Sequence, residues 1–141
     1  MRFMIIVKAT PESEAGTMPP PEAFEAMGRF NEALISAGVL LAAEGLHPSS
    51  QGSRITSEAG RLIVRDGPFT EAKELIAGFW VISAKSRDEA LEWVKRIPFA
   101  DGETIELRRV YEAADFADIV PAEAVAQEQA WRDANQKPLT N

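Results

Sequence analysis

The residues of this sequence best suited to chemistry are its single histidine, His47, and an aspartate, Asp66. The ordinary pKa of an imidazole lies near neutrality, which makes His47 the natural candidate for a general acid or base. A carboxylate such as that of Asp66 can hold an imidazole in one tautomer and stabilise its protonated form. We therefore take His47 and Asp66 as a candidate catalytic pair for proton transfer, as in an elimination, an isomerisation or a related lyase step.

Both residues also have simpler explanations. His47 precedes Pro48 in a turn-rich stretch, where a solvated loop histidine needs no chemical role. Asp66 precedes Gly67, and an aspartate in that setting commonly bonds nearby backbone amides and holds a turn in place. The structural and chemical roles of Asp66 are compatible, so the sequence leaves both open.

Three cations near the candidate pair, Arg54, Arg65 and Lys73, are candidate substrate-binding residues. If the segment that carries the arginines faces a cavity, the three charges would hold a small anion or a polar ring compound at its mouth. The alternative is that Lys73 lies on an exposed helical turn with two glutamates, where each charge pair contributes about 0.2–0.5 kcal/mol.

Glycine- and proline-rich turns hold the candidate residues on either side of a predicted β-hairpin. Its strands are expected at 54–56 and 61–65, joined by a turn at 57–60. His47 comes before this hairpin and Asp66 directly after it. The hairpin is therefore expected to fold the two residues together.

Apolar periodicity predicts the remaining elements in chain order: a buried strand at 2–9, a loop at 10–21, a helix from Pro21 to Gly38, a strand at 39–43, a central strand at 75–84, a helix between Ser86 and Pro98 and a last strand at 104–111. Without the hairpin this order is βαββαβ, the ferredoxin-like arrangement. The fold class is thus α+β, with two helices on one face of an antiparallel sheet. Phe24, Phe79 and Trp80 are expected in the core.

The second face of such a sheet also needs a cover if it is apolar, and in a chain of 141 residues the economical cover is a second subunit. We therefore expect a homodimer. One compact domain is expected over residues 1–116, followed by a peripheral helix and tail over 117–141, with Pro121 at the start of the helix.

Composition argues against several classes of function. The chain has 22 acidic and 15 basic residues and a formal charge of −7, so it repels the phosphate backbone of nucleic acids. With no cysteine and one histidine, it lacks the usual ligands of zinc and copper. Glycine-rich phosphate-binding motifs are missing from the sequence. We expect no nucleic-acid partner, no metal and no cofactor.

The first residues also bear on location. The apolar run Phe3 to Val7 is flanked by charges and is far shorter than the apolar stretch of about 20 residues that a membrane span needs. A sequence without cysteine suits a reducing compartment. We expect a cytoplasmic protein with no membrane segment.

The longest motif runs from Asp66 to Phe79, with the sequence DGPFTEAKELIAGF. It resembles the hallmark of the DGPF group within the YCII-related family. The Gly45–Pro48 stretch, the strand from Glu103 to Tyr111 and the following Asp115-Phe116 are similar to that group as well, so the resemblance spans roughly residues 1–116. Arg65 is a departure, because relatives commonly carry a small polar residue before the aspartate.

The resemblance implies a ferredoxin-like fold assembled as a dimeric α/β barrel, with the active site near the dimer interface. In YCII-type relatives a histidine and an aspartate form the proposed catalytic pair, which supports His47 and Asp66 here. Most DGPF proteins have no assigned activity. Three hypotheses about function therefore stay open: an acid–base enzyme, a ligand-binding or regulatory domain without catalysis, and a structural interaction module.

Overall fold

The protein was analysed as a computed structural model, which describes residues 1–136 apart from the side chain of Lys73. The strands in this part are β1 Arg2–Lys8, β2 Leu40–Gly45, β3 Ser53–Glu58, β4 Arg61–Asp66, β5 Ile76–Ser83 and β6 Ile105–Arg109; the α-helices are α1 Pro11–Glu14, α2 Pro21–Ser36, α3 Arg87–Val94 and α4 Ala122–Asn135. Three short 3-10 helices, η1 Ser49–Gln51, η2 Ala72–Glu74 and η3 Ala113–Phe116, complete the order. The predicted order of strands, helices and hairpin is confirmed.

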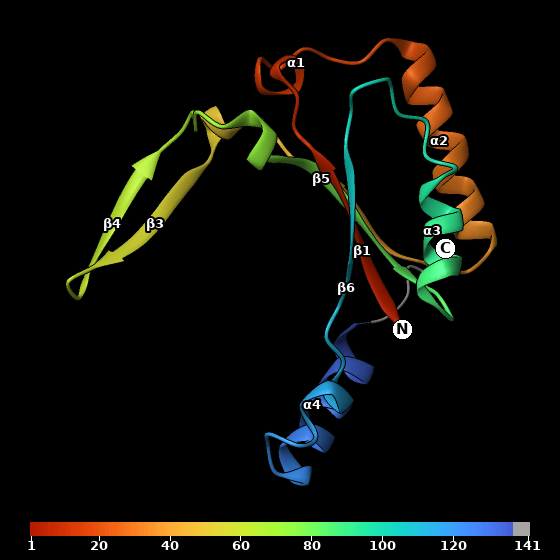
Figure 1. Ribbon diagram of the computed structural model, residues 1–141, viewed down its shortest axis with the longest axis vertical. Helices are drawn as coiled ribbons and strands as arrows, with labels where there is room; N and C mark the ends of the chain where they lie inside the picture. Colours follow the sequence, from red (N-terminus) through yellow and green to blue (C-terminus); the bar gives the residue numbers. More distant parts are fainter. Residues whose placement is uncertain (137–141) are drawn as a thin grey trace.

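The main sheet has four strands in the order β2-β5-β1-β6, and every neighbouring pair is antiparallel. β5, the most apolar stretch, lies between β1 and β2, as expected for its β-branched and aromatic residues. Helices α2 and α3 cover one face of this sheet (Figure 1). The protein is therefore a mixed α+β structure with α2 and α3 on one side of its main sheet.

The core lies between the sheet and those two helices. Alternate residues of β1 and β5, such as Ile5 and Ile82, are fully buried on this face, where they meet Leu34 of α2. Phe30 of α2 contacts Trp80 of β5 edge to face, with ring centroids 5.5 Å apart. Apolar residues recur every second position in the strands and about every 3.6 positions in the helix, so each element turns one apolar side toward the other.

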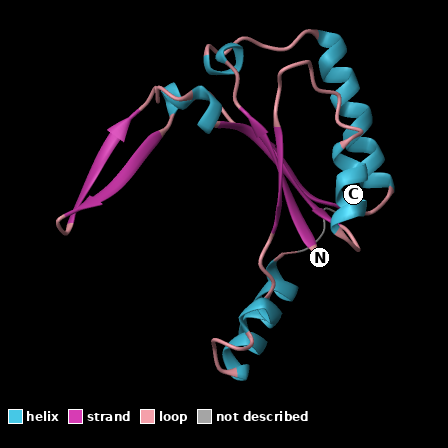
Figure 2. Ribbon diagram, viewed as in Figure 1, coloured by secondary structure: helices cyan, strands magenta, loops and turns pink. Residues whose placement is uncertain are grey.

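No helix covers the centre of the other face of the sheet in the described chain (Figure 2), and only the end of α4 reaches it, at Arg2. We call it the open face, and its centre consists of the cross-strand pairs Met4–Val81 and Ile6–Phe79. These four side chains are half-buried in the single chain. The open face of a single protomer is therefore an apolar surface that is partly exposed to solvent.

The hairpin β3–β4 projects away from the sheet on the side opposite α2 and α3 (Figure 1). Its two strands form a sheet of their own, joined by a turn in which Ala59 and Gly60 have positive φ angles of 49° and 79°. Helix α4 lies at the opposite end of the main sheet, as a peripheral element. Among residues 1–136, no helix has the length and apolar character needed to cross a membrane.

Three expectations from the sequence were wrong: a loop at residues 11–14, and core positions for Phe24 and Phe79. Residues 11–14, expected as part of a loop, form the short helix α1, because Thr10 caps its first turn and Ser13 bonds back to the Thr10 amide. Phe24, expected in the core, is 55% exposed, because it lies in the first turn of α2, where a groove lies between the helix and the sheet. Trp80 is buried, whereas Phe79 is half-buried on the open face.

Candidate functional site

A groove of about 500 Å³ separates the first half of α2 from the sheet beneath it. We call it the α2 groove. Its lining comes from α2 (Phe24, Met27, Gly28, Asn31), from β2 and β5 (Ala43, Glu44, Gly45, Ala77, Gly78, Phe79, Trp80), and from Val7 and Pro19. Most of this lining is apolar, which suits a small organic molecule better than an ion.

Glycines create this space. A side chain added at Gly28 of α2 or at Gly45 of β2 would meet no atom within 4 Å, so both positions leave open volume. Glycine is required at position 78 of β5 for a different reason. A Cβ there would lie 2.8 Å from the carbonyl oxygen of Glu44, which is too close. The strands can approach closely at Gly78, and no side chain rises from the sheet at either glycine of the Gly45–Gly78 pair.

One polar side chain is held inside the apolar lining. The indole Nε1 of Trp80 donates a hydrogen bond of 2.8 Å to Oδ1 of Asn31, which fixes the orientation of the amide. The Asn31 side-chain nitrogen has no hydrogen-bond acceptor among the described residues. An amide nitrogen has two N–H donors, so Asn31 can donate to an acceptor on a bound molecule.

Among the described residues that line the groove, one is titratable, Glu44. Glu44 pairs directly with Phe79 across β2 and β5, so its exposed side chain points to the open face and away from the groove. Over the described residues no cluster of three or more histidine, cysteine, aspartate or glutamate side chains is placed to hold a metal ion. Binding by shape, apolar contact and one or two hydrogen bonds is therefore what the groove offers.

The predicted pair His47 and Asp66 lies elsewhere. His47 follows β2 in an exposed loop and makes no side-chain hydrogen bond within the described part of the chain. The Asp66 carboxylate, at the end of β4, accepts a 2.6 Å hydrogen bond from the Ser53 hydroxyl across the hairpin. This bond links the two strands of the hairpin, and the expected bonds from Asp66 to backbone amides of its turn stay a prediction. A catalytic role for the two residues stays a prediction.

The predicted cations are carried by the hairpin and by η2. Arg54 and Arg65 are direct cross-strand neighbours, so both point to the same face of the hairpin. Arg54 lies over the Phe69 ring at 4.0 Å, and Arg65 forms a 2.9 Å ion pair with Glu58. The expected cluster is therefore engaged locally rather than gathered at the α2 groove. Lys73 lies in η2, and its side chain is outside the described residues.

Reasoning from the sequence missed Asn31 and the three glycines of the groove. One signal was available, because Gly28 interrupts a long helix at a cost of about 1 kcal/mol relative to alanine, and such a glycine needs a packing or functional reason. Asn31 gave no signal, since its role depends on Trp80, a residue 49 positions away.

The base of the hairpin is fastened to the rest of the molecule through Ser49. The Ser49 amide and hydroxyl both donate to the carboxylate of Glu14 in α1, and the hydroxyl also accepts a hydrogen bond of 3.0 Å from the Phe69 amide. Gly67 lies directly against the Ser49 backbone, and its amide donates a hydrogen bond of 2.9 Å to the Gly52 carbonyl. The motif from Asp66 to Phe69 thus serves as the root of the hairpin.

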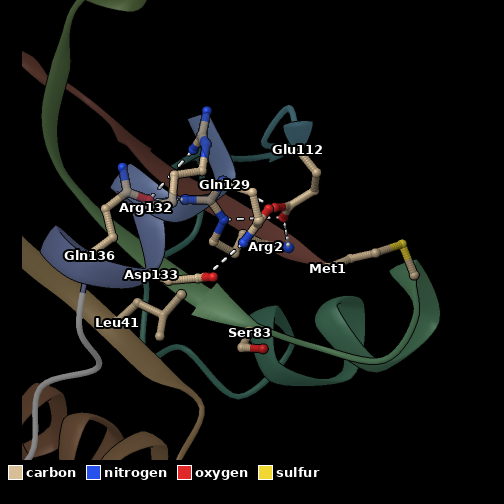
Figure 3. Close-up of a pocket in the computed structure, with 9 residues that line it drawn as sticks. All are labelled: Met1, Arg2, Leu41, Ser83, Glu112, Gln129, Arg132, Asp133 and Gln136. Carbon is tan, nitrogen blue, oxygen red and sulfur yellow. Dashed lines mark hydrogen bonds and ion pairs between the residues drawn. The ribbon is translucent and has the colours of Figure 1, made fainter. Parts of the chain in front are cut away.

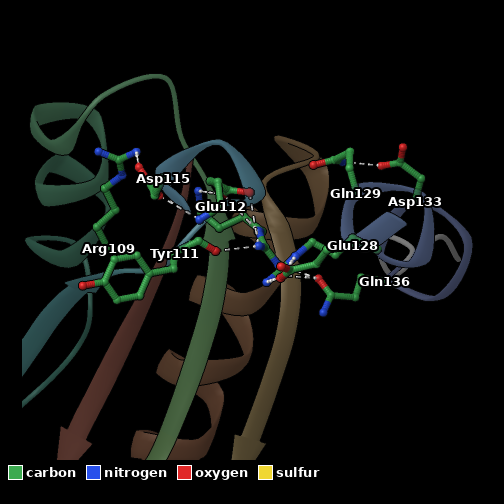
Figure 4. A network of polar contacts seen from close by, with 10 residues as sticks. Arg109, Tyr111, Glu112, Asp115, Glu128, Gln129, Asp133 and Gln136 are labelled. Atoms are coloured by element: carbon green, nitrogen blue, oxygen red, sulfur yellow. Dashed lines mark hydrogen bonds and ion pairs between the residues drawn. The ribbon is translucent and has the colours of Figure 1, made fainter. Parts of the chain in front are cut away.

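A second polar cluster joins α4 to the start of β1 (Figures 3 and 4). The Arg2 guanidinium donates to both carboxylate oxygens of Glu112 at 3.1 Å, to the Tyr111 carbonyl at 3.2 Å and to the Gln136 side chain. Partial burial raises the pKa of Glu112, but the hydrogen bonds and the charge of Arg2 outweigh it, so the pKa of Glu112 lies below its usual value.

We expect Glu112→Gln to lower the free energy of unfolding by about 1 kcal/mol at neutral pH, because a bidentate charged pair is lost. A carboxylate whose pKa is lowered on folding stabilises the folded state above its unfolded pKa, and this contribution disappears as the pH falls through the folded pKa. Urea unfolding should therefore show the difference between wild type and variant shrinking below a pH of about 4.3. Glu123→Gln, an exposed position of α4, is the control, and an equal loss there would contradict the role of Arg2.

Comparison with known proteins gives three results. The family model of the YCII-related domain matches residues 1–114. An uncharacterized protein of Rhizobium meliloti (strain 1021) is 37% identical over 70 residues, which is 50% of this chain and 56% of that protein. The chain therefore spans about half the length of the curated relative it matches.

The third result is a solved structure, that of 5-chloro-2-hydroxyhydroquinone dehydrochlorinase from Burkholderia phenoliruptrix AC1100 in complex with 2,5-dihydroxybenzoquinone. It superimposes with a TM-score of 0.43 at 20% sequence identity and covers 79% of this chain and 95% of the other.

Proposed function

The chain belongs to the YCII-related domain family, and from that premise we propose that it is a homodimeric protein that binds a small organic molecule in the α2 groove. One observation carries the proposal: glycines leave a groove of about 500 Å³ in which an oriented amide, that of Asn31, keeps an unused donor. Volumes of this size and apolar linings with few polar groups are typical of small-molecule sites.

The ligand class follows from the lining. Apolar walls favour a compound with a largely apolar body, and the Asn31 amide requires a hydrogen-bond acceptor on that body. A multiply charged anion fits poorly, because no cationic side chain lines the groove among the described residues.

Dimer formation is the second part of the proposal. The open face presents the apolar pairs Met4–Val81 and Ile6–Phe79 without a cover in the single chain. The strand order β2-β5-β1-β6 with helices on one face supports the ferredoxin-like assignment, and an apolar open face supports a dimeric α/β barrel with the sheets facing each other. The motif at 66–69 supports a place in the DGPF group. A cytoplasmic location stays a prediction.

Catalysis by His47 and Asp66 is the alternative function. Gly45, two residues before His47, lines the groove, which supports a place for the imidazole near the groove mouth once a partner subunit is bound. His47 would then act as general acid or base in an elimination or isomerisation. The lining of the groove argues against catalysis, because Glu44 is the one titratable residue in it within the described chain. A non-catalytic ligand-binding domain is therefore favoured.

The decisive experiment is a thermal-shift screen of small metabolites on wild type and on Gly28→Leu. The leucine side chain would occupy the open volume, and we expect affinity to fall at least tenfold for any ligand of the groove. Helix stability should not suffer, since leucine is a better helix former than glycine by about 0.8 kcal/mol. A ligand at 100 times its dissociation constant adds about 2.7 kcal/mol to the free energy of unfolding. The smaller thermal shift of the Gly28→Leu variant is therefore measurable.

The matched control is Arg29→Leu, which adds the same apolar side chain at the next position of α2, outside the groove lining. Wild-type affinity in this control together with weak binding in Gly28→Leu supports the site. Equal affinity in both variants would move the ligand elsewhere. His47→Gln separates the two functions: turnover by the wild type that is lost in this variant while binding is retained indicates catalysis by His47, whereas binding without turnover in the wild type indicates a binding domain.

A further inference from the structure

The hairpin β3–β4 has no cover in the single chain. Every residue of both strands except Ile63 is exposed. Ile55, Leu62 and Val64 are 61%, 75% and 62% exposed, and the register places them on one face, opposite the arginines. A two-stranded hairpin is at best marginally stable in water, and a cluster of exposed apolar side chains marks an interaction surface.

A second uncovered element lies at the other end of the sheet. We call residues 112–136, with η3 and α4, the C-terminal arm. Two of its apolar side chains, Ile119 and Trp131, are 78% and 57% exposed. The arm begins next to Arg2 at the start of β1, whereas the hairpin leaves the sheet beside Leu46 and Ala77, near the end of β1. Within one chain the hairpin and the arm therefore lie at opposite ends of the sheet (Figure 1).

Charge distinguishes these two surfaces. Between residues 53 and 66 the hairpin has three arginines and two acids, a net charge of +1. The C-terminal arm has six acids (Glu112, Asp115, Asp118, Glu123, Glu128, Asp133) and one arginine, a net charge of −5. Arg61 on the hairpin, and Asp118 and Glu123 on the arm, have no ion-pair partner among the described residues.

Two dimers are compatible with open faces that meet around a two-fold axis. An axis parallel to the strands brings hairpin to hairpin and arm to arm. An axis perpendicular to the strands brings each hairpin to the arm of the other copy. The first arrangement places the two acidic arms together, although Arg2 and Arg109 each neutralise one carboxylate of their own arm. The second keeps the acidic arms apart and covers both exposed apolar surfaces.

We propose that in the homodimer the hairpin β3–β4 of one copy packs on the C-terminal arm of the other, with Ile55, Leu62 and Val64 against its exposed apolar side chains. This rests on the dimer proposed above and adds its axis and its partner surfaces. The apolar contact supplies the affinity, and the separation of the two acidic arms favours this axis. The hairpin arginines lie on the other face of the hairpin and stay outside the contact. The contact gives the hairpin the cover that it lacks in the single chain.

Cross-linking tests the axis directly, because the chain has no cysteine and an introduced one is unique. The S57C variant places a thiol on the apolar face of the hairpin, and A130C places one beside Trp131 on the arm. After subunit exchange between the two variants, a short bismaleimide should join them into a covalent dimer, and S57C alone should give none.

Each other outcome overturns the inference. Efficient cross-linking of S57C with itself indicates the parallel axis. A dimer by analytical ultracentrifugation that cross-links in neither experiment leaves the open-face dimer standing but removes the hairpin–arm contact. A chain that stays monomeric at every concentration removes the dimer itself, and the inference with it.

The affinity of the dimer gives an independent check. Leu62→Ser should raise the dimer dissociation constant at least tenfold without changing the fold of the protomer, because this side chain is 75% exposed in the single chain. Met18→Ser, at an equally exposed apolar residue of the loop before α2, should leave the constant unchanged. A constant that is unchanged in L62S would overturn the proposed contact.

Discussion

Leu34→Ala should lower the free energy of unfolding by about 3 kcal/mol and the melting temperature by about 10 °C. Leu34 is fully buried, and its side chain lies in the core cluster between α2 and the sheet. Alanine removes three carbon atoms there and leaves a cavity that the surrounding strands can only partly close. Since α2 also forms the outer wall of the groove, the loss should weaken ligand binding as well.

Ile35→Ala is the matched control for this prediction. Ile35 is the next residue of the same helix and is 39% exposed, so its truncation should cost less than about 1 kcal/mol. Thermal and urea unfolding of the two variants side by side give the comparison. Similar losses in both would mean that α2 is not held to the sheet through the face that contains Leu34.

Gly67→Ala is the second change with a large expected effect, about 3 kcal/mol. A Cβ at this position would lie 1.8 Å from the carbonyl oxygen of Ser49 and 2.6 Å from its carbonyl carbon. Both are backbone atoms, so no side-chain rotation can relieve the overlap, and the root of the hairpin must shift. We expect a lower melting temperature together with fast hydrogen exchange of the amides in β3 and β4.

Gly52→Ala tests the same turn without the overlap. A Cβ at Gly52 would be 3.4 Å from the same Ser49 oxygen, and its φ of −107° is open to any residue. We expect a change below about 1 kcal/mol and slow exchange in the hairpin. If Gly52→Ala proved as damaging as Gly67→Ala, the cause would be a general intolerance of this turn and not the close approach of Gly67.

The motif at the root of the hairpin shows how far sequence reasoning reached. The pattern from Asp66 to Phe69 pointed to the YCII-related family, and the match over residues 1–114 confirms that membership. A turn held by bonds from Asp66 to backbone amides was one of the two explanations left open; the structure instead gives Asp66 a bond to the Ser53 hydroxyl across the hairpin. The pairing of Asp66 with His47 was expected from chain proximity to the hairpin, and the single chain shows no hydrogen bond between them.

Local patterns determined the elements of this protein. Alternating or continuous apolar residues gave β1 and β5, the period of 3.6 gave α2, and Gly38 ended that helix with a φ of +68°. Such signals depend on residues within a few positions of one another. They therefore specify which main strands and helices form and in which order, the hairpin, and the general α+β class, whereas the exact bounds and the short helix α1 were not predicted.

The tertiary structure alone decided where the candidate site lies. The α2 groove exists because Gly28, Gly45 and Gly78, far apart in the sequence, come together where α2 crosses the ends of β2 and β5. Asn31 points its amide there because of a bond to Trp80, and the hairpin takes Arg54 and Arg65 away from the groove. The physical reason is that strand order and the direction of an inserted hairpin depend on contacts across the whole chain, which periodicity within a short segment does not encode.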